Sequence, residues 1–152
     1  MTLDKFTIKA QEAVQAAVNI AQQNGQQSIE PVHLLKGVIE KGKDVTNFVF
    51  QKLGVNAQQI DTLVASEIQH LPRVQGGNVY LSNDANKVLT RAQEYATKMG
   101  DEFVSIEPIL LALLDVSSTA SRILHDAGCA EKEMTKAITE LRQGQNVKSQ
   151  SG

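Results

Sequence analysis

The feature that most constrains the fold of this chain is a four-residue stretch that occurs twice. Ser28-Ile29-Glu30-Pro31 returns as Ser105-Ile106-Glu107-Pro108, 77 positions later. An alanine-rich segment that ends in glycine precedes each copy, and a leucine-rich segment follows each copy. Repetition at a fixed spacing is the signature of architectures built from duplicated units. Two copies are too few for a solenoid, so the sequence predicts one domain made by tandem duplication.

Helical periodicity runs through the first half. Thr7 is a favourable N-cap, and the apolar residues after it follow the i, i+3, i+4, i+7, i+11 spacing of one helix face: Ala10, Ala13, Val14, Ala17 and Ala21. Gly25 is expected to end this helix, because glycine tolerates a left-handed backbone. Three further helices are predicted, with N-caps at Ser28, Asp44 and Asn56. The first repeat is therefore assigned to about residues 5–70.

The second half repeats this pattern after a connector at 71–80, which contains proline and paired glycines. Ser82 stands 75 positions after Thr7, and the apolar stripe and the glycine stop keep the same spacing. The spacing grows to 77 at the repeated tetrapeptide, which predicts a two-residue insertion in 101–104, and it falls to 74 further on. The second repeat is assigned to about residues 81–142.

The predicted fold class is all-α, with eight helices in two four-helix repeats related by an approximate two-fold rotation. Helices whose apolar faces match in this way are expected to pack alike. A single domain is assigned to residues 1–150, and the polar, aperiodic segment 143–152 is assigned to a linker.

Composition argues against several classes of function. The net charge of −2, without a basic stripe, disfavours nucleic acid as a partner. No apolar run reaches the length of a membrane span, so no membrane partner is expected. The single cysteine, Cys129, cannot form an internal disulfide, which favours a reducing, cytoplasmic compartment. Cys129 itself is expected to be a small core residue. His33, His70 and His125 lack metal-ligand spacing, so no metal site is predicted.

One segment, residues 37–44, comes close to a phosphate-binding loop. Such a loop needs Ser or Thr after its lysine, because that hydroxyl ligates Mg²⁺, and here the residue is Asp44. The segment also closes a predicted helix instead of following a strand. No nucleotide cofactor and no catalytic group are predicted, so the residues by themselves indicate a binding module and not an enzyme.

The duplicated pattern resembles the N-terminal domain of the Clp family of AAA+ unfoldases. The resemblance rests on Phe6-Thr7 and Leu81-Ser82 at equivalent helix starts, on the glycine stops, and on acidic helix starts that lead into leucine pairs. The connector 71–76 and the exit 141–147 are similar to those of the bacterial disaggregase branch. The resemblance covers residues 1 to about 150, and it implies a domain that engages unfolded or aggregated polypeptides and helps to pass them to a hexameric ATPase ring.

The resemblance also implies partners outside this chain. The ATPase modules of the same parent chain would bind ATP and Mg²⁺, none of which is expected in this domain, and a co-chaperone would cooperate with the whole protein. An alternative within the family is the adaptor-docking N-domain of a protease-coupled unfoldase, which would have the same fold and a folded partner.

Family positions linked to substrate binding are carried here by Thr7, Asp101, Glu107 and Leu89. Two other groove positions, which are apolar in the family, are Arg91 and Pro108 here. Thr7 also has a local explanation as an N-cap, and Glu107 has one as an acid at the positive end of a helix dipole. Asp101 lies in the predicted insertion and has no such explanation, which makes it the strongest candidate. The first three residues are expected to lie together at the rim of an apolar groove that includes Leu89.

Overall fold

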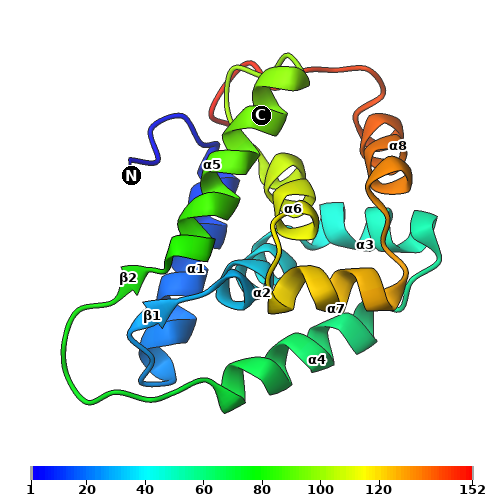
Figure 1. Ribbon diagram of the computed structural model, residues 1–152. Helices are drawn as coiled ribbons and strands as arrows, with labels where there is room; N and C mark the ends of the chain where they lie inside the picture. Colours follow the sequence, from blue (N-terminus) through cyan, green and yellow to red (C-terminus); the bar gives the residue numbers. More distant parts are fainter. Residues whose placement is uncertain (1, 152) are drawn as a thin grey trace.

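The computed structural model describes residues 2–151, and within them the chain forms eight α-helices and two very short strands (Figure 1). The first repeat contains α1 (Ile8–Gln23), α2 (Pro31–Lys41), α3 (Lys43–Leu53) and α4 (Ala57–His70). The second contains α5 (Asn83–Lys98), α6 (Ile106–Asp115), α7 (Thr119–Ala127) and α8 (Glu131–Arg142). The strands are β1 (Ser28–Ile29) and β2 (Tyr80–Leu81). The predicted all-α fold of two four-helix repeats is confirmed, and the strands were not predicted.

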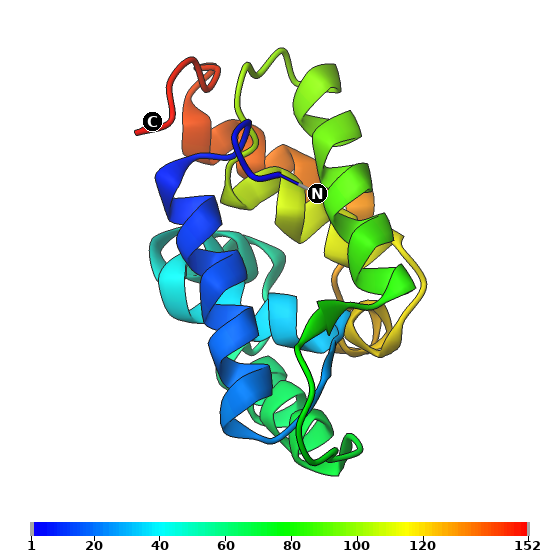
Figure 2. The ribbon, with the colours of Figure 1, turned by 90° about the vertical axis from the view of Figure 1, so that its left-hand side faces the viewer.

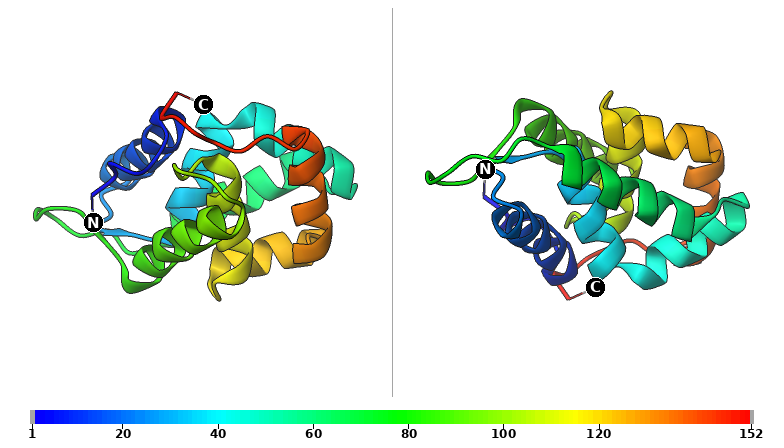
Figure 3. Two further views of the ribbon diagram at one scale, coloured as in Figure 1. Left: turned by 90° about the horizontal axis from the view of Figure 1, so that it is seen from above. Right: turned by 90° about the horizontal axis from the view of Figure 1, so that it is seen from below.

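Two central helices, α2 and α6, carry the core. Helix α1 packs on α2, α5 packs on α6, and α2 and α6 contact each other. Every residue of α6 from Ile106 to Leu114 is buried. Seen from above, α1 and α5 lie on one side of these helices and α8 lies on the other (Figure 3, left). No helix within residues 2–151 is long and apolar enough to cross a membrane.

The outer helices pair across the repeats. Helix α3 packs against α8, and α4 packs against α7 (Figure 1). A two-fold operation that exchanges the repeats turns α3 into α7 and α8 into α4, so it converts the first pair into the second. The two pairs are therefore one contact made twice, as the predicted two-fold symmetry requires.

Two short parallel backbone pairings follow the same rule. Strand β1 pairs with β2, with Ile29 opposite Leu81 (Figure 2). Phe6 and Val104 form a second parallel bridge at the other end of α1. Each pairing joins the segment before the second helix of one repeat to the segment before the first helix of the other repeat.

These pairings correct the register of the duplication. The equivalent paired residues Ile29 and Val104 stand 75 positions apart. The helices that follow start from the N-caps Glu30 and Ser105, which are also 75 positions apart. The spacing of the first helices therefore continues without change, and the predicted two-residue insertion in 101–104 is wrong.

The repeated tetrapeptide is not a pair of equivalent elements. Ser28-Ile29 forms β1, whereas Ser105-Ile106 is the N-cap and first residue of α6. Pro31 explains the difference, because proline suits the first position of a helix and keeps the preceding residue extended. Glu30 is therefore the N-cap of α2, with φ −99° and ψ 166°, and the prediction of Ser28 as its cap is wrong.

The other predicted caps give a mixed result. Thr7 Oγ1 accepts a hydrogen bond from the backbone of Ala10 (3.1 Å), and Asn56 caps α4 in the same way, so both are confirmed. Helix α3 starts after Gly42, so Asp44 lies in its first turn and is not its cap. The segment 37–44 thus runs from the middle of α2 into α3, with no strand before it.

Gly37 sets the closest approach between two helices. A Cβ atom added at this position in α2 would lie 2.1 Å from the carbonyl oxygen of Ala13 in α1. Ala112, which stands 75 positions later in α6, is also small and is fully buried. The 75-residue register therefore aligns the small residues of the two central helices.

His33 links three elements of the first repeat. Its Nδ1 accepts a hydrogen bond from the backbone N–H of Glu30 (2.8 Å), so its Nε2–H donates to Gln26 Oε1 (2.7 Å). Gln26 Nε2 in turn donates to the carbonyl of Ile68 in the last turn of α4 (2.6 Å). Burial lowers the pKa of His33 below its usual value, although the nearby Glu30 carboxylate opposes this effect.

Gly37→Ala is expected to destabilise the protein by about 1–3 kcal/mol, because the added methyl group meets the backbone of α1. In a helix without this close contact, the same change would raise the free energy of unfolding by about 1 kcal/mol. The direction of the measured change therefore distinguishes the steric effect from the effect of helix propensity. Urea unfolding measures the difference, with the exposed helix position Ser66→Ala as a control expected to change little. A variant as stable as the parent would contradict the close packing.

The stability of the protein is expected to fall as pH drops from 7.5 to 5.5. The unfolded chain takes up a proton at His33 near its ordinary pKa, whereas the folded chain, with its lowered pKa, does not. One such group gives a slope of at most about 1.4 kcal/mol per pH unit, and this slope vanishes well above the ordinary pKa. Urea titrations of His33→Gln should show a smaller slope than the parent. The exposed His70→Gln serves as the control, and equal slopes in all three proteins would refute the role of His33.

Candidate functional site

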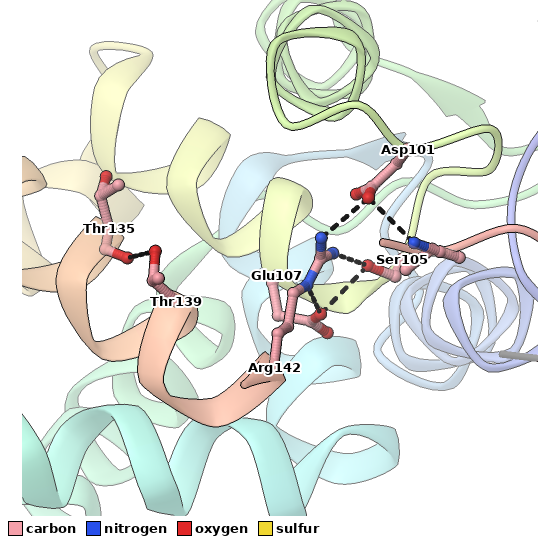
Figure 4. Close-up of polar contacts among 7 residues, drawn as sticks. Asp101, Ser105, Glu107, Thr135, Thr139 and Arg142 are labelled. Carbon is pink, nitrogen blue, oxygen red and sulfur yellow. Dashed lines mark hydrogen bonds and ion pairs between the residues drawn. The ribbon is translucent and has the colours of Figure 1, made fainter. Parts of the chain in front are cut away.

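Arg142, the last residue of α8, binds both carboxylates that were predicted for the site (Figure 4). Its Nη1 donates to Asp101 Oδ1 and its Nε donates to Glu107 Oε1, each at 2.8 Å. Its Nη2 donates to Ser105 Oγ (2.9 Å), and that hydroxyl donates to Glu107 Oε1 (3.3 Å). These four residues, called the Arg142 cluster below, tie the end of α8 to the junction between α5 and α6.

The Arg142 cluster is buried and carries a net negative charge. The side chains of Asp101, Arg142 and Glu107 are 0%, 10% and 11% exposed. Two carboxylates face one guanidinium, which leaves a formal charge of −1. Asp101 Oδ2 is buried and has no hydrogen-bond partner among residues 2–151. Because burying an unpaired polar group is costly, this oxygen favours a further donor.

Thr7 lies next to the cluster along the backbone pairing. Its N–H donates to the carbonyl of Val104 (2.9 Å), one residue before Ser105. The structure thus brings Thr7, Asp101 and Glu107 to adjoining segments. Leu89, in contrast, is fully buried inside α5 and contributes to the core, not to an exposed surface.

The two departures from the family groove have local partners. Arg91 Nε donates to Asp115 Oδ2 (2.8 Å) and its Nη1 donates to Glu94 Oε1 (2.9 Å), while its guanidinium lies 4.6 Å from the centre of the Tyr95 ring. Pro108 is buried in the first turn of α6. Arg91 also lines a surface hollow, together with Asn86, Lys87, Thr90, Glu94 and Val116.

A cavity of about 170 Å³ opens beside the Arg142 cluster. Met99 and Ile138 supply apolar lining, Arg142 contributes to its wall, and residues 144–146 border it. The site therefore combines an acidic cluster with a small hollow that can hold an apolar side chain. Within residues 2–151, no group of three or more histidine, cysteine or acidic side chains is placed to hold a metal ion.

The segment after α8 lies on this same region. Gln143 and Gly144 have φ values of 53° and 80°, which reverse the chain. Val147 then donates its N–H to Asp101 Oδ1 (3.0 Å) and accepts a hydrogen bond from the N–H of Glu102 (2.8 Å). Residues 143–150, called the exit strap below, have no helix, as expected of a linker, but they are hydrogen-bonded to the domain.

Sequence reasoning missed Arg142, Ser105 and Val147, although the duplication contains a signal for the first. With the 74-residue spacing of the last helices, Arg142 stands where the buried Ile68 stands in the first repeat. Asp101 stands 75 positions after Gln26, the residue that binds the backbone of Ile68. An arginine at a buried apolar position, together with an acid at its partner position, indicates an ion pair.

Comparison with known proteins gives consistent results. The family described as Clp repeat (R) N-terminal domain matches residues 5–127. The chaperone protein ClpB of Bacteroides thetaiotaomicron is 58% identical over 151 residues, and that of Porphyromonas gingivalis is 48% identical over 151 residues. Each alignment covers 99% of this chain and 18% of the relative, so the chain spans about a fifth of their length. The crystal structure of the Hsp104 N-terminal domain from Candida albicans matches with a TM-score of 0.85 and 23% identity over 97% of each chain.

Arg142→Leu is expected to destabilise the protein by about 3 kcal/mol, because it leaves two buried carboxylates without their cation. Lys52→Leu is the matched control. It removes the exposed ion pair between Lys52 of α3 and Glu140 of α8, the helix that ends at Arg142, and it should lower the free energy of unfolding by at most about 1 kcal/mol. Urea unfolding at pH 7 measures both.

The first repeat suggests a double variant that should recover stability. Asp101→Gln combined with Arg142→Ile has the residue types of the Gln26–Ile68 contact, and it should be more stable than Arg142→Ile alone. Equal losses for Arg142→Leu and Lys52→Leu would show that the cluster contributes little.

Proposed function

Because this chain belongs to the Clp repeat N-terminal domain family, we propose that it is the substrate-binding N-terminal domain of a ClpB-type protein disaggregase. It engages unfolded or aggregated polypeptides and helps to pass them to the ATPase ring of its parent protein. The observation that carries this proposal is the match to ClpB at 58% identity along 151 residues.

The Arg142 cluster supports a location for binding. Thr7, Asp101 and Glu107 form the polar side of the proposed site, while Leu89 lies buried in α5. The net charge of −1 and the free oxygen of Asp101 favour a lysine or arginine of the substrate. Met99 and Ile138, the apolar lining of the neighbouring hollow, contact an apolar side chain of the same segment.

Binding by this site is weak and only partly electrostatic. An extended, flexible chain loses conformational freedom when it docks, and the hollow is small. The charged contribution falls as salt rises, whereas the apolar contribution persists. Weak binding suits a domain that hands its substrate on.

The remaining parts of the machine belong to the parent protein in this proposal. Its ATPase modules bind ATP and Mg²⁺ and form the hexamer, and a co-chaperone assists it. This domain works in the cytoplasm, without catalysis. Burial raises the pKa of the Cys129 thiol to about 11, which makes it a poor nucleophile near neutral pH and fits a packing role.

The adaptor-docking alternative has less support. Both reported sequence relatives are named chaperone protein ClpB, and the solved structure with a TM-score of 0.85 is an Hsp104 domain. An adaptor-docking domain would bind one folded partner and ignore unfolded chains, so one titration with an unfolded protein separates the two functions.

Asp101→Asn is expected to weaken binding of an unfolded protein about 5- to 10-fold, which corresponds to about 1.0–1.4 kcal/mol. Asparagine keeps an acceptor for Val147 and Arg142 but removes the negative charge. Fluorescence anisotropy with labelled, carboxymethylated α-lactalbumin measures the affinity at low and high salt.

Asp115→Asn is the matched control for this experiment. It removes one exposed carboxylate at the far end of α6 and should leave the affinity unchanged. Equal weakening by both changes would indicate a general charge effect, and unchanged affinity in a folded Asp101→Asn protein would remove Asp101 from the site.

A further inference from the structure

Two segments of this chain occupy equivalent positions in the two repeats. After α4, the connector returns to the end of α1, where the N–H of Val74 donates to the carbonyl of Gly25 (2.8 Å). After α8, the exit strap returns to the end of α5, where Val147 contacts Asp101 and Glu102. The connector runs from α4 to β2, and the exit strap follows α8.

The exit strap is bound as an extended peptide would be bound. Both backbone groups of Val147 are hydrogen-bonded, one to the Asp101 carboxylate and one to the N–H of Glu102. Val147 is 8% exposed, and it is the one buried residue of the strap. Five residues earlier, Arg142 supplies a positive charge to the same acidic cluster. Backbone hydrogen bonds with one side-chain pocket are a recurrent mode of recognition for extended segments.

We propose that the exit strap is a releasable occupant of this surface, and that an extended segment of a substrate polypeptide takes its place. This inference rests on the proposed function. The favoured segment carries a lysine or arginine for the acidic cluster and an apolar side chain for the position that Val147 occupies.

The contacts allow this exchange without unfolding of the core. Release of the strap exposes one valine side chain and frees a few hydrogen bonds, including the one from Ile8 N–H to the carbonyl of Gln150 (2.8 Å). The guanidinium of Arg142 stays with Asp101 Oδ1, and the basic residue of the substrate binds the free Asp101 Oδ2. Substrate binding therefore frees the segment through which the chain leaves the domain.

Val147→Asp tests this inference, because a charge at this buried position displaces the strap and leaves the helices intact. If the open form is a minority of about 10–20%, full opening raises the affinity about 5- to 10-fold. The probe is labelled, carboxymethylated α-lactalbumin, measured by fluorescence anisotropy. Val74→Asp makes the same chemical change at an exposed site of the connector and should leave the affinity unchanged.

A second measurement follows the strap directly. In the parent protein, saturation with the probe should move the amide resonance of Val147 to its random-coil position and raise its hydrogen-exchange rate. A chain that ends at Gly144 repeats the affinity comparison without a buried charge, and circular dichroism checks that both variants keep their helices.

The outcomes separate this inference from the proposed function. Tighter binding by Val147→Asp and by the shortened chain, with Val74→Asp unchanged, supports the exchange. Probe binding by the parent that is equal or weaker in both strap variants leaves the proposed function in place and overturns the exchange. No probe binding by any of the four proteins overturns both.

Discussion

The structure depends on contacts that each repeat makes with the other. The pairs α3–α8 and α4–α7 both cross between the halves, as do the two parallel backbone pairings. The central helices α2 and α6 also contact each other. A four-helix repeat of this kind therefore leaves apolar surface and strand edges uncovered when it is alone, and the duplication itself completes the core.

In each repeat, one polar side chain that follows the first helix binds the last helix, and these two contacts differ in charge. After its glycine turn, the first repeat uses Gln26, which donates to the backbone of Ile68 in α4. The second uses Asp101, which accepts from Arg142 in α8. The neutral contact leaves no buried side-chain atom of Gln26 unpaired. The ionic contact leaves a surplus negative charge and an unpaired oxygen on Asp101. The two repeats therefore differ in charge at equivalent positions, and Asp101 lies where they differ.

The sequence allowed most of the helices to be predicted, because stripes such as Ala10, Ala13 and Val14 carry a long periodic signal. Strands of two residues give no such signal. The repeated tetrapeptide predicted the wrong register, because its identical residues are not structurally equivalent. Pro31 fixes where α2 begins. The acids of the site came from family resemblance, while their partner Arg142 depends on a fold that brings residues 41 positions apart into contact.

The two ends of the described chain meet. Gln150 Nε2 donates to the carbonyl of Asp4 (2.9 Å), and Ile8 N–H donates to the carbonyl of Gln150. A short linker between them would close the polypeptide into a ring, and a cut at the exposed glycines of the connector would reopen it between the repeats. Such a circular permutant would present the repeats in the opposite order around the same core. The order of the two repeats along the chain therefore does not affect how their helices pack.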